Sequence, residues 1–183
     1  MKAVFSRGIL EVVVALTLVL GSSDGFKRKY EDRFLDYGIY TIMNRGLDKQ
    51  LLTFVLPTNA TDANGGGVPS AVPPEMRFAG SADGGQKWRL DEAALYTAFE
   101  LRPTLNENYV LEYIPETRIL RWLSGWGNTK LWYLLDAGDN FSWIKHKRYD
   151  VCLHATDNKP VIAKECDGSI FQQWKFLTGK ESA

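Results

Sequence analysis

The chain has 183 residues, which is enough for one domain with a substantial hydrophobic core and short for two. Its 22 Lys and Arg residues balance its 22 Asp and Glu residues, so no net charge directs it to nucleic acid or to an anionic membrane. The chain is rich in aromatic residues, with 6 Trp, 8 Tyr and 9 Phe. This enrichment fits both a β-rich core and a contact surface.

The first 25 residues have the pattern of a secretory signal peptide. Lys2 and Arg7 form a positive region, residues 12–20 form a short apolar run, and small residues follow it. A membrane anchor is the alternative, but it requires about 20 apolar residues and this run has about half of that. We therefore expect residues 1–25 to be a signal peptide, residues 26–183 to form a single secreted domain, and no stable membrane insertion.

Four short stretches with alternating apolar and polar residues are predicted to be β-strands. They are YTIMNRG at 40–46, NYVLEYI at 108–114, TRILRWL at 117–123 and KPVIAKE at 159–165. Residues 57–74 are rich in Gly, Pro and Ser and are predicted to form a long surface loop. Outside the N-terminal segment no long stretch has sustained helical spacing, although residues 91–101 could hold one helical turn. The prediction is an all-β fold.

A motif centred on tryptophan occurs three times, as QKWRL at 86–90, KLWYL at 130–134 and QQWKF at 172–176. Trp88, Trp132 and Trp174 are 44 and 42 residues apart, and Leu or Phe follows each of them two positions later. Residues two apart share one face of a strand, so both are expected to point inward. Three copies at a nearly constant period indicate an internal repeat of about 42–44 residues.

This pattern resembles the ricin-B-type β-trefoil, in which each of three repeats closes with Gln-x-Trp. The third repeat, VCLHATDNKPVIAKECDGSIFQQWKFL at 151–177, matches best, whereas Lys130 replaces the glutamine in the second. The resemblance implies a pseudo-threefold all-β fold with repeats at roughly 34–91, 92–136 and 137–178, the 57–74 loop being an insertion in the first. It also implies structural roles for the motif residues Gln86, Trp88, Trp132, Gln172 and Trp174.

Cys152 and Cys166 are the two cysteines of the chain, and secretion favours a disulfide between them. Zinc is the alternative, because His146 and His154 lie with both cysteines inside 21 residues, and two Cys with two His are chemically sufficient. The spacing matches no usual zinc pattern. We therefore predict the disulfide, with no metal and no cofactor.

In ricin-type lectins a sugar is held by an Asp after Cys-Leu, by a stacking aromatic ring and by an Asn before the motif Gln. Sugars have an apolar C–H face and a rim of hydroxyls, which this combination matches. Counting back from the motif Trp, the second repeat keeps the best set, and Glu112, Trp122 and Asn128 are predicted to bind carbohydrate. The alternative is that Glu112 is a solvated strand residue and that Trp122 belongs to the core.

The other two repeats depart from this pattern. In the third, the corresponding positions hold His154, Lys164 and Phe171, so the scaffold is expected without the pocket. In the first, Phe78 holds the aromatic position, and Thr53 is the expected occupant of the acidic one.

Catalysis has little support in the sequence. Neither histidine belongs to a nucleophile motif, and no Gly-rich phosphate loop follows a strand. Asn59 and Asn140 begin Asn-x-Ser/Thr triplets and are glycosylation acceptors in a eukaryotic secretory pathway.

The leading hypothesis is a secreted, non-enzymatic module that binds carbohydrate or a cell-surface glycoprotein. A second hypothesis is the binding subunit of a toxin assembly. The chain resembles, more distantly, the ricin-like subunits of cytolethal distending toxins, which also keep the trefoil while losing much of the sugar pocket. A third is a protease inhibitor that acts through the 57–74 loop.

Overall fold

The computed structural model describes Leu35 and residues 38–55, 73–80, 85–92, 98–123, 127–157 and 160–179. All of them belong to one compact unit, Asp32–Ala183. The predicted signal peptide, Asn59 and all but the last two residues of the 57–74 loop lie outside the described residues, so these predictions stay predictions. Among the described residues, no helix has the length and apolar character that a membrane crossing requires.

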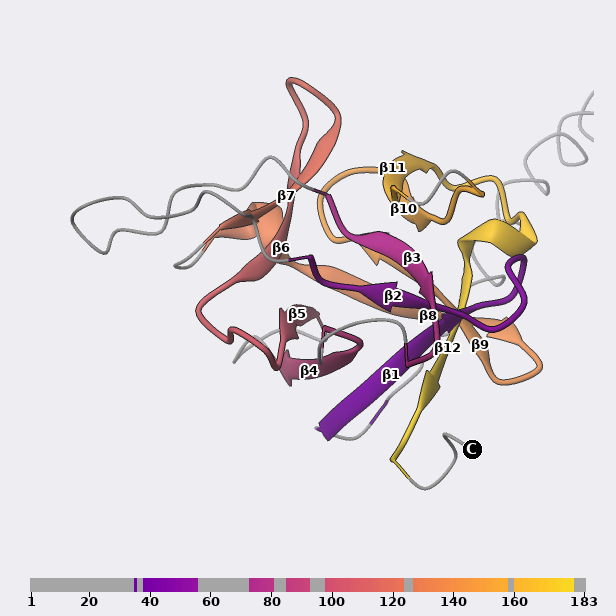
Figure 1. Ribbon diagram of the computed structural model, residues 1–183. Helices are drawn as coiled ribbons and strands as arrows, with labels where there is room; N and C mark the ends of the chain where they lie inside the picture. The colour runs from indigo at the N-terminus through magenta and orange to yellow at the C-terminus, as the bar shows by residue number, and fades with distance from the viewer. Residues whose placement is uncertain are drawn as a thin grey trace, which may run out of the picture. The chain divides into compact units, whose positions relative to one another are not determined.

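The described residues form twelve strands in three sets of four (Figure 1). The first set is β1 (Gly38–Asn44), β2 (Gln50–Thr53), β3 (Glu75–Phe78) and β4 (Lys87–Glu92). The second is β5 (Phe99–Pro103), β6 (Val110–Ile114), β7 (Ile119–Leu123) and β8 (Trp132–Gly138), with the 3-10 helix η2 (Asn128–Lys130) before β8. The third is β9 (Phe141–His146), β10 (Val151–His154), β11 (Ile162–Glu165) and β12 (Gln173–Leu177), with η3 (Ile170–Gln172) before β12.

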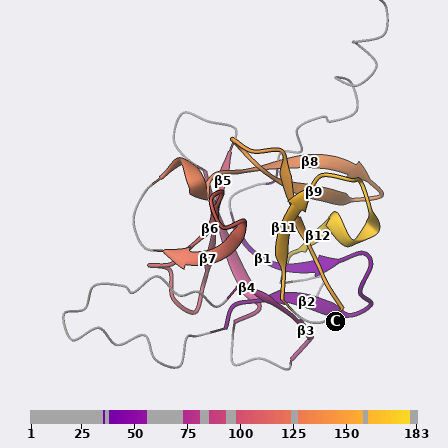
Figure 2. The same cartoon turned by 90° about the horizontal axis from the view of Figure 1, so that it is seen from above.

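Six of these strands close a barrel. The first and last strands of each set pair antiparallel in the order β1, β4, β5, β8, β9 and β12, and β12 returns to pair with β1. The two middle strands of each set form the hairpins β2–β3, β6–β7 and β10–β11 (Figure 2). Closure leaves the barrel without free edges. The architecture is a β-trefoil, which confirms the predicted all-β, pseudo-threefold fold.

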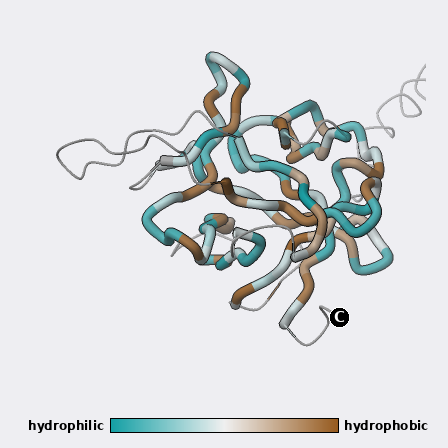
Figure 3. Tube along the Cα trace, viewed as in Figure 1, coloured by the Kyte–Doolittle hydropathy of each residue, from teal (hydrophilic) through white to brown (hydrophobic). Residues whose placement is uncertain are grey.

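The three motif tryptophans occupy equivalent places in the core. Each ring is fully buried, and each indole Nε1 donates a hydrogen bond to a carbonyl oxygen of the hairpin in its own repeat. The pairs are Trp88 with Leu52 at 2.8 Å, Trp132 with Leu111 at 3.2 Å and Trp174 with Leu153 at 3.0 Å. The colour along the chain changes repeatedly between hydrophilic and hydrophobic (Figure 3), and in β1 the buried residues Tyr40, Ile42 and Asn44 are two apart, so that one side of this strand faces the core.

The motif glutamines hold the chain between a hairpin and the following barrel strand. Gln172 Nε2 donates to the carbonyl of Glu165 at 2.7 Å, and its Oε1 accepts from the amide of Asp167 at 2.9 Å. Gln86 Nε2 donates in the same way to the carbonyl of Phe78 at 2.8 Å. An amide side chain suits this role because it both donates and accepts.

Cys152 and Cys166 form the predicted disulfide, with their Cα atoms 5.1 Å apart. The bond ties β10 to the residue that follows β11, and it removes both thiolates from the alternative zinc set. Within the described ranges, no group of His, Cys, Asp and Glu side chains is arranged to hold a metal ion.

His146 is a structural histidine at the end of β9. Its side chain is fully buried, and its Nδ1 accepts hydrogen bonds from the amides of Arg148 and Tyr149 at 3.1 and 3.2 Å. The ring lies edge-on to Trp132, with 5.0 Å between centroids. Burial lowers the pKa of His146 below its ordinary value of 6.5, and the nearby Arg148 charge acts in the same direction. An Nδ1 that accepts two amides has no room for a proton.

We predict that acid destabilises this fold through its histidines. Because the folded-state pKa is lowered, His146 contributes its full stability above about pH 6.5, where the unfolded chain is also neutral. The free energy of unfolding should fall below that pH by at most about 1.4 kcal/mol per pH unit for each such group. Burial also lowers the pKa of His154, which adds a contribution of the same sign. Urea unfolding at pH 7.5, 6.5 and 5.5 measures the slope.

The control for this prediction is His146→Asn. The asparagine Oδ1 can accept the same two amides but does not titrate in this range. The variant should show a shallower loss of stability between pH 6.5 and 5.5. An identical slope in wild type and variant would show that His146 does not couple folding to pH.

Candidate functional site

The structure separates Trp122 from Glu112, which corrects the predicted sugar site, whereas η2, which begins at Asn128, lies against Glu112 through the Thr129 hydroxyl. Trp122 is 0% exposed, and its ring stacks on Trp88 with 5.6 Å between centroids. Glu112 pairs across the β6–β7 hairpin with Arg121, the neighbour of Trp122, so Glu112 and Trp122 point to opposite faces. A ring with no exposed surface cannot stack on a sugar. The prediction for Trp122 is therefore wrong.

The aromatic position was misplaced because the three repeats differ in length after their hairpins. The core-facing residues opposite Leu52, Leu111 and Leu153 are Met76, Trp122 and Ala163. They precede the motif tryptophans by 12, 10 and 11 residues. Since a shift of one residue reverses the face of a strand, a fixed offset of ten selects different faces in different repeats.

Glu112 is held by its own repeat. Arg121 Nε lies 2.9 Å from one carboxylate oxygen, and the Thr129 hydroxyl donates to the other at 2.6 Å. Lys130, which replaces the motif glutamine, is 1% exposed. Burial lowers the pKa of Lys130, and the charges of Glu112 and Glu100 act in the opposite direction. These internal contacts engage both oxygens of Glu112, and the residue is only 5% exposed, so little of its carboxylate is presented to a ligand.

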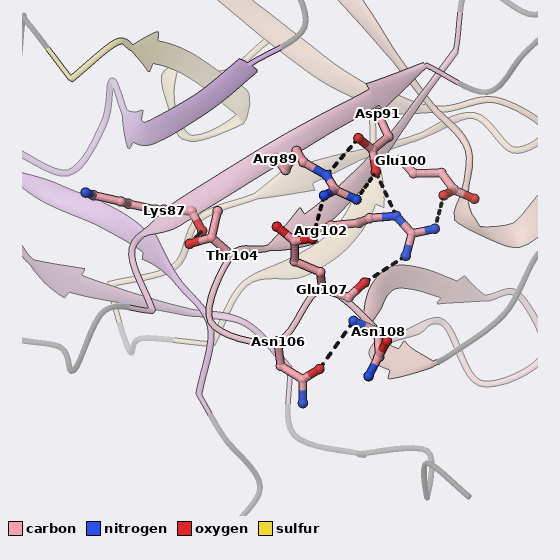
Figure 4. Close-up of polar contacts among 9 residues, drawn as sticks. All are labelled: Lys87, Arg89, Asp91, Glu100, Arg102, Thr104, Asn106, Glu107 and Asn108. Carbon is pink, nitrogen blue, oxygen red and sulfur yellow. Dashed lines mark hydrogen bonds and ion pairs between the residues drawn. The ribbon is translucent and has the colours of Figure 1, made fainter.

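A network of charged side chains lies on β4, β5 and the turn that follows β5 (Figure 4). Arg102 lies 2.5 Å from Glu100 and 3.0 Å from Asp91, and Arg89 lies 2.8 Å from Asp91 and 2.5 Å from Glu107. The Glu100 side chain is 3% exposed and that of Arg102 is 14% exposed. Two guanidinium groups thus bridge three carboxylates. The network braces β4, β5 and the turn that follows β5.

The first repeat does not assemble a sugar site from its predicted residues either. Thr53 is fully buried, and its hydroxyl donates to the carbonyl of Leu51 at 3.0 Å. Phe78 is 61% exposed, but it pairs with Gln50, three positions from Thr53. Thr53 and Phe78 therefore lie on opposite faces of the β2–β3 hairpin.

The third repeat places polar and apolar groups side by side at the corresponding position. His154, at the end of β10, is the counterpart of Glu112 and pairs with Ile162 of β11, which is 42% exposed. The imidazole lies 5.9 Å from the Phe171 ring, and both residues are half-buried. Lys164 lies on the same outward side of β11 as Ile162, two residues along the strand. We call this set, His154, Ile162, Lys164 and Phe171, the His154 face.

Hydrogen bonding leaves one buried polar atom of this face unmatched. Within the described part of the chain, Nδ1 of His154 has no partner. Burial lowers the pKa of His154, as does the charge of Lys164, so the imidazole is neutral at pH 7. Asp167 accepts from Lys164 Nζ at 2.9 Å and from the Ser169 amide at 2.9 Å, and these contacts lower the pKa of Asp167 to about 2.

The chemistry of the His154 face suits a neutral hydroxylated ligand. A neutral imidazole nitrogen can donate or accept one hydrogen bond, and the adjacent ring and isoleucine offer apolar contact. The sequence contained a signal for this face. A histidine replaces the carboxylate and a phenylalanine precedes the motif glutamine, but the comparison with lectins favoured interpreting both as losses.

No protein-family model matches the chain, and no curated protein matches its sequence. Its fold matches solved structures. A mosquitocidal holotoxin is 17% identical with a TM-score of 0.66 over 81% of this chain, which spans only 17% of the holotoxin chain. The protein SeviL, solved with an asialo-GM1 saccharide, is 14% identical with a TM-score of 0.58, over 79% of this chain and 99% of SeviL. A chain of the Haemophilus ducreyi cytolethal distending toxin is 13% identical with a TM-score of 0.59, over 80% and 89% of the two chains. The shared property is the β-trefoil fold.

Proposed function

We propose that this protein is a secreted, non-enzymatic β-trefoil module that binds carbohydrate through the His154 face. The observation that carries the proposal is the half-buried His154 imidazole, which lies beside the Phe171 ring and pairs across the hairpin with the exposed Ile162. A sugar hydroxyl can hydrogen-bond to the imidazole where it reaches solvent, while the sugar C–H face packs on the apolar residues.

Two further observations support this assignment. The structure of SeviL with a saccharide is an example of this fold carrying a sugar ligand. The second-repeat carboxylate accepts from Arg121 and Thr129, whereas Lys164 and Asp167 in the third repeat bond to each other and act on the imidazole through their charges. A binding role without catalysis fits these residues, because they include no nucleophile paired with a base.

A glycan array probed with the disulfide-intact secreted chain tests this proposal. Wild type should bind a subset of neutral glycans, and His154→Ala should weaken that binding about tenfold, the equivalent of roughly 1.4 kcal/mol for one hydrogen bond with its apolar contact. Phe78→Ala is the matched control, because it removes an exposed ring from the first repeat. Thermal melts of each variant check that the fold is intact.

Three outcomes would contradict the assignment. Loss of binding in Phe78→Ala but not in His154→Ala would move the ligand to the first repeat. Equal glycan binding by wild type and both variants would place the ligand away from the His154 face and from Phe78. Silence of a cooperatively folded wild type on the array would count against carbohydrate altogether.

A second candidate is the binding subunit of a multi-subunit toxin that contacts a partner protein. The fold likeness to chains of the holotoxin and of the distending toxin favours it, as do three exposed isoleucines in the second and third repeats. They are Ile119, Ile162 and Ile170, with 43%, 42% and 49% of their surface exposed. Co-elution with the product of a neighbouring gene in size-exclusion chromatography would support this function, and its absence would argue against it.

A further inference from the structure

The turn between β8 and β9 carries an Asn-x-Ser triplet. Gly138, Asp139 and Asn140 form its exposed tip, and all three have positive φ, with values of 78°, 53° and 64°. Asn140 begins the triplet Asn140-Phe141-Ser142, which is the pattern that N-linked glycosylation requires. An exposed hairpin tip can carry a large substituent without displacing the core.

The third residue of this triplet is unusual for its place in the fold. Ser142 lies in β9 opposite Asp136 and Trp174 and is 0% exposed. Among the described residues, no group forms a hydrogen bond with its Oγ. A buried hydroxyl without a partner is less favourable than a methyl group in the same space. No hydrogen bond among the described residues of the barrel depends on this hydroxyl.

Neighbouring contacts fix the turn. Arg45 Nη2 lies 2.8 Å from Asp139, and the Arg45 guanidinium lies 4.9 Å from the centre of the Phe141 ring. Arg45 Nη1 also donates to Gln173 Oε1 at 2.9 Å, which ties the turn between β1 and β2 to β12. A substituent on Asn140 would consequently project from a braced turn.

We propose that Asn140 is an N-glycosylation site, and that the Ser142 hydroxyl acts as the third position of its acceptor triplet before β9 folds. The donor is an oligosaccharide linked through pyrophosphate to a lipid carrier in a eukaryotic secretory pathway. A bond forms from the Asn140 amide nitrogen to C1 of the first sugar as the bond from C1 to phosphate breaks. The lipid pyrophosphate leaves, and the amide nitrogen loses one proton. The inference is independent of the His154 face.

Secretion from insect or mammalian cells provides the first test, with Asn59→Gln as background so that only one triplet remains. Intact mass before and after amidase release of N-glycans should show one glycan, and peptide mapping should place it on Asn140. Asn140→Gln and Ser142→Ala should both lose the glycan, whereas Ser142→Thr should keep it. An unmodified Asn140 in the secreted background protein would overturn the proposal.

Unglycosylated protein from a bacterial periplasm provides the second test, because it isolates the folded state. If Ser142 has no folded role, Ser142→Ala should melt at the same temperature as wild type or higher. A clear drop in Tm would show that the barrel uses the hydroxyl, and the argument from Ser142 would fail. The two readouts separate a role before folding from a role in the folded barrel.

Discussion

Trp122→Ala is expected to lower the free energy of unfolding by about 3–5 kcal/mol, the range for removing a large buried aromatic side chain. The ring is fully buried and contacts Trp88 and Phe54, with centroid distances of 5.6 and 4.9 Å. It fills the point at which the hairpins of the first and second repeats meet the motif tryptophan of the first. A cavity there removes aromatic contacts from both repeats.

Trp122→Phe is the matched variant. Within the described residues the indole Nε1 of Trp122 has no hydrogen-bond partner, so phenylalanine removes an unsatisfied donor while it keeps an aromatic ring. We expect a smaller loss than for alanine, from the volume difference alone. Urea unfolding of wild type and the two variants measures both values. If Trp122→Ala instead kept full stability and lost glycan binding, the ring would be a ligand contact and the second-repeat site would be restored.

The sequence predicted the architecture because the fold depends on a periodic signal. Trp88, Trp132 and Trp174 recur at a nearly constant interval, and each forms the same bond to its own hairpin. That signal tolerates changes in loop length, because each tryptophan is buried in the core and bonds there to a hairpin carbonyl of its own repeat. The number of repeats was accessible in this way, whereas the strands were predicted from local alternation and the disulfide from the pair of cysteines.

The candidate site was less accessible because it depends on which face each residue takes. The prediction placed Trp122 at the surface, but the structure buries it, because the second repeat has fewer residues between its hairpin and its motif tryptophan than the other two repeats have. Glu112 was expected to face a ligand, but Arg121 and Thr129 satisfy it, and Lys130 lies close enough for its charge to interact. Contacts of this kind depend on side-chain reach across strands and η2, which the spacing of residues along a chain does not encode.

Arg102→Ala is expected to destabilise the protein by about 3–5 kcal/mol, because it removes the guanidinium that forms an ion pair with the buried Glu100 carboxylate. The Glu100 side chain is 3% exposed, so water cannot replace the lost guanidinium. Arg89→Ala is the control in the same network. Its side chain is 37% exposed and its partners Asp91 and Glu107 reach solvent, so its loss should cost at most about 1 kcal/mol.

A double substitution separates the value of the ion pair from the cost of an orphaned charge. Glu100→Gln combined with Arg102→Met removes both charges and keeps similar side-chain volume, and it should recover most of the stability that Arg102→Ala loses. Urea unfolding at pH 7 gives the free energies of unfolding of wild type, of Arg102→Ala and of the double variant. If the double variant is as unstable as Arg102→Ala, the pair contributes strongly in its own right. If the double variant recovers its stability, each charge of the pair is required only because its buried partner is present. The barrel strands β4 and β5 then do not need the ion pair in order to associate.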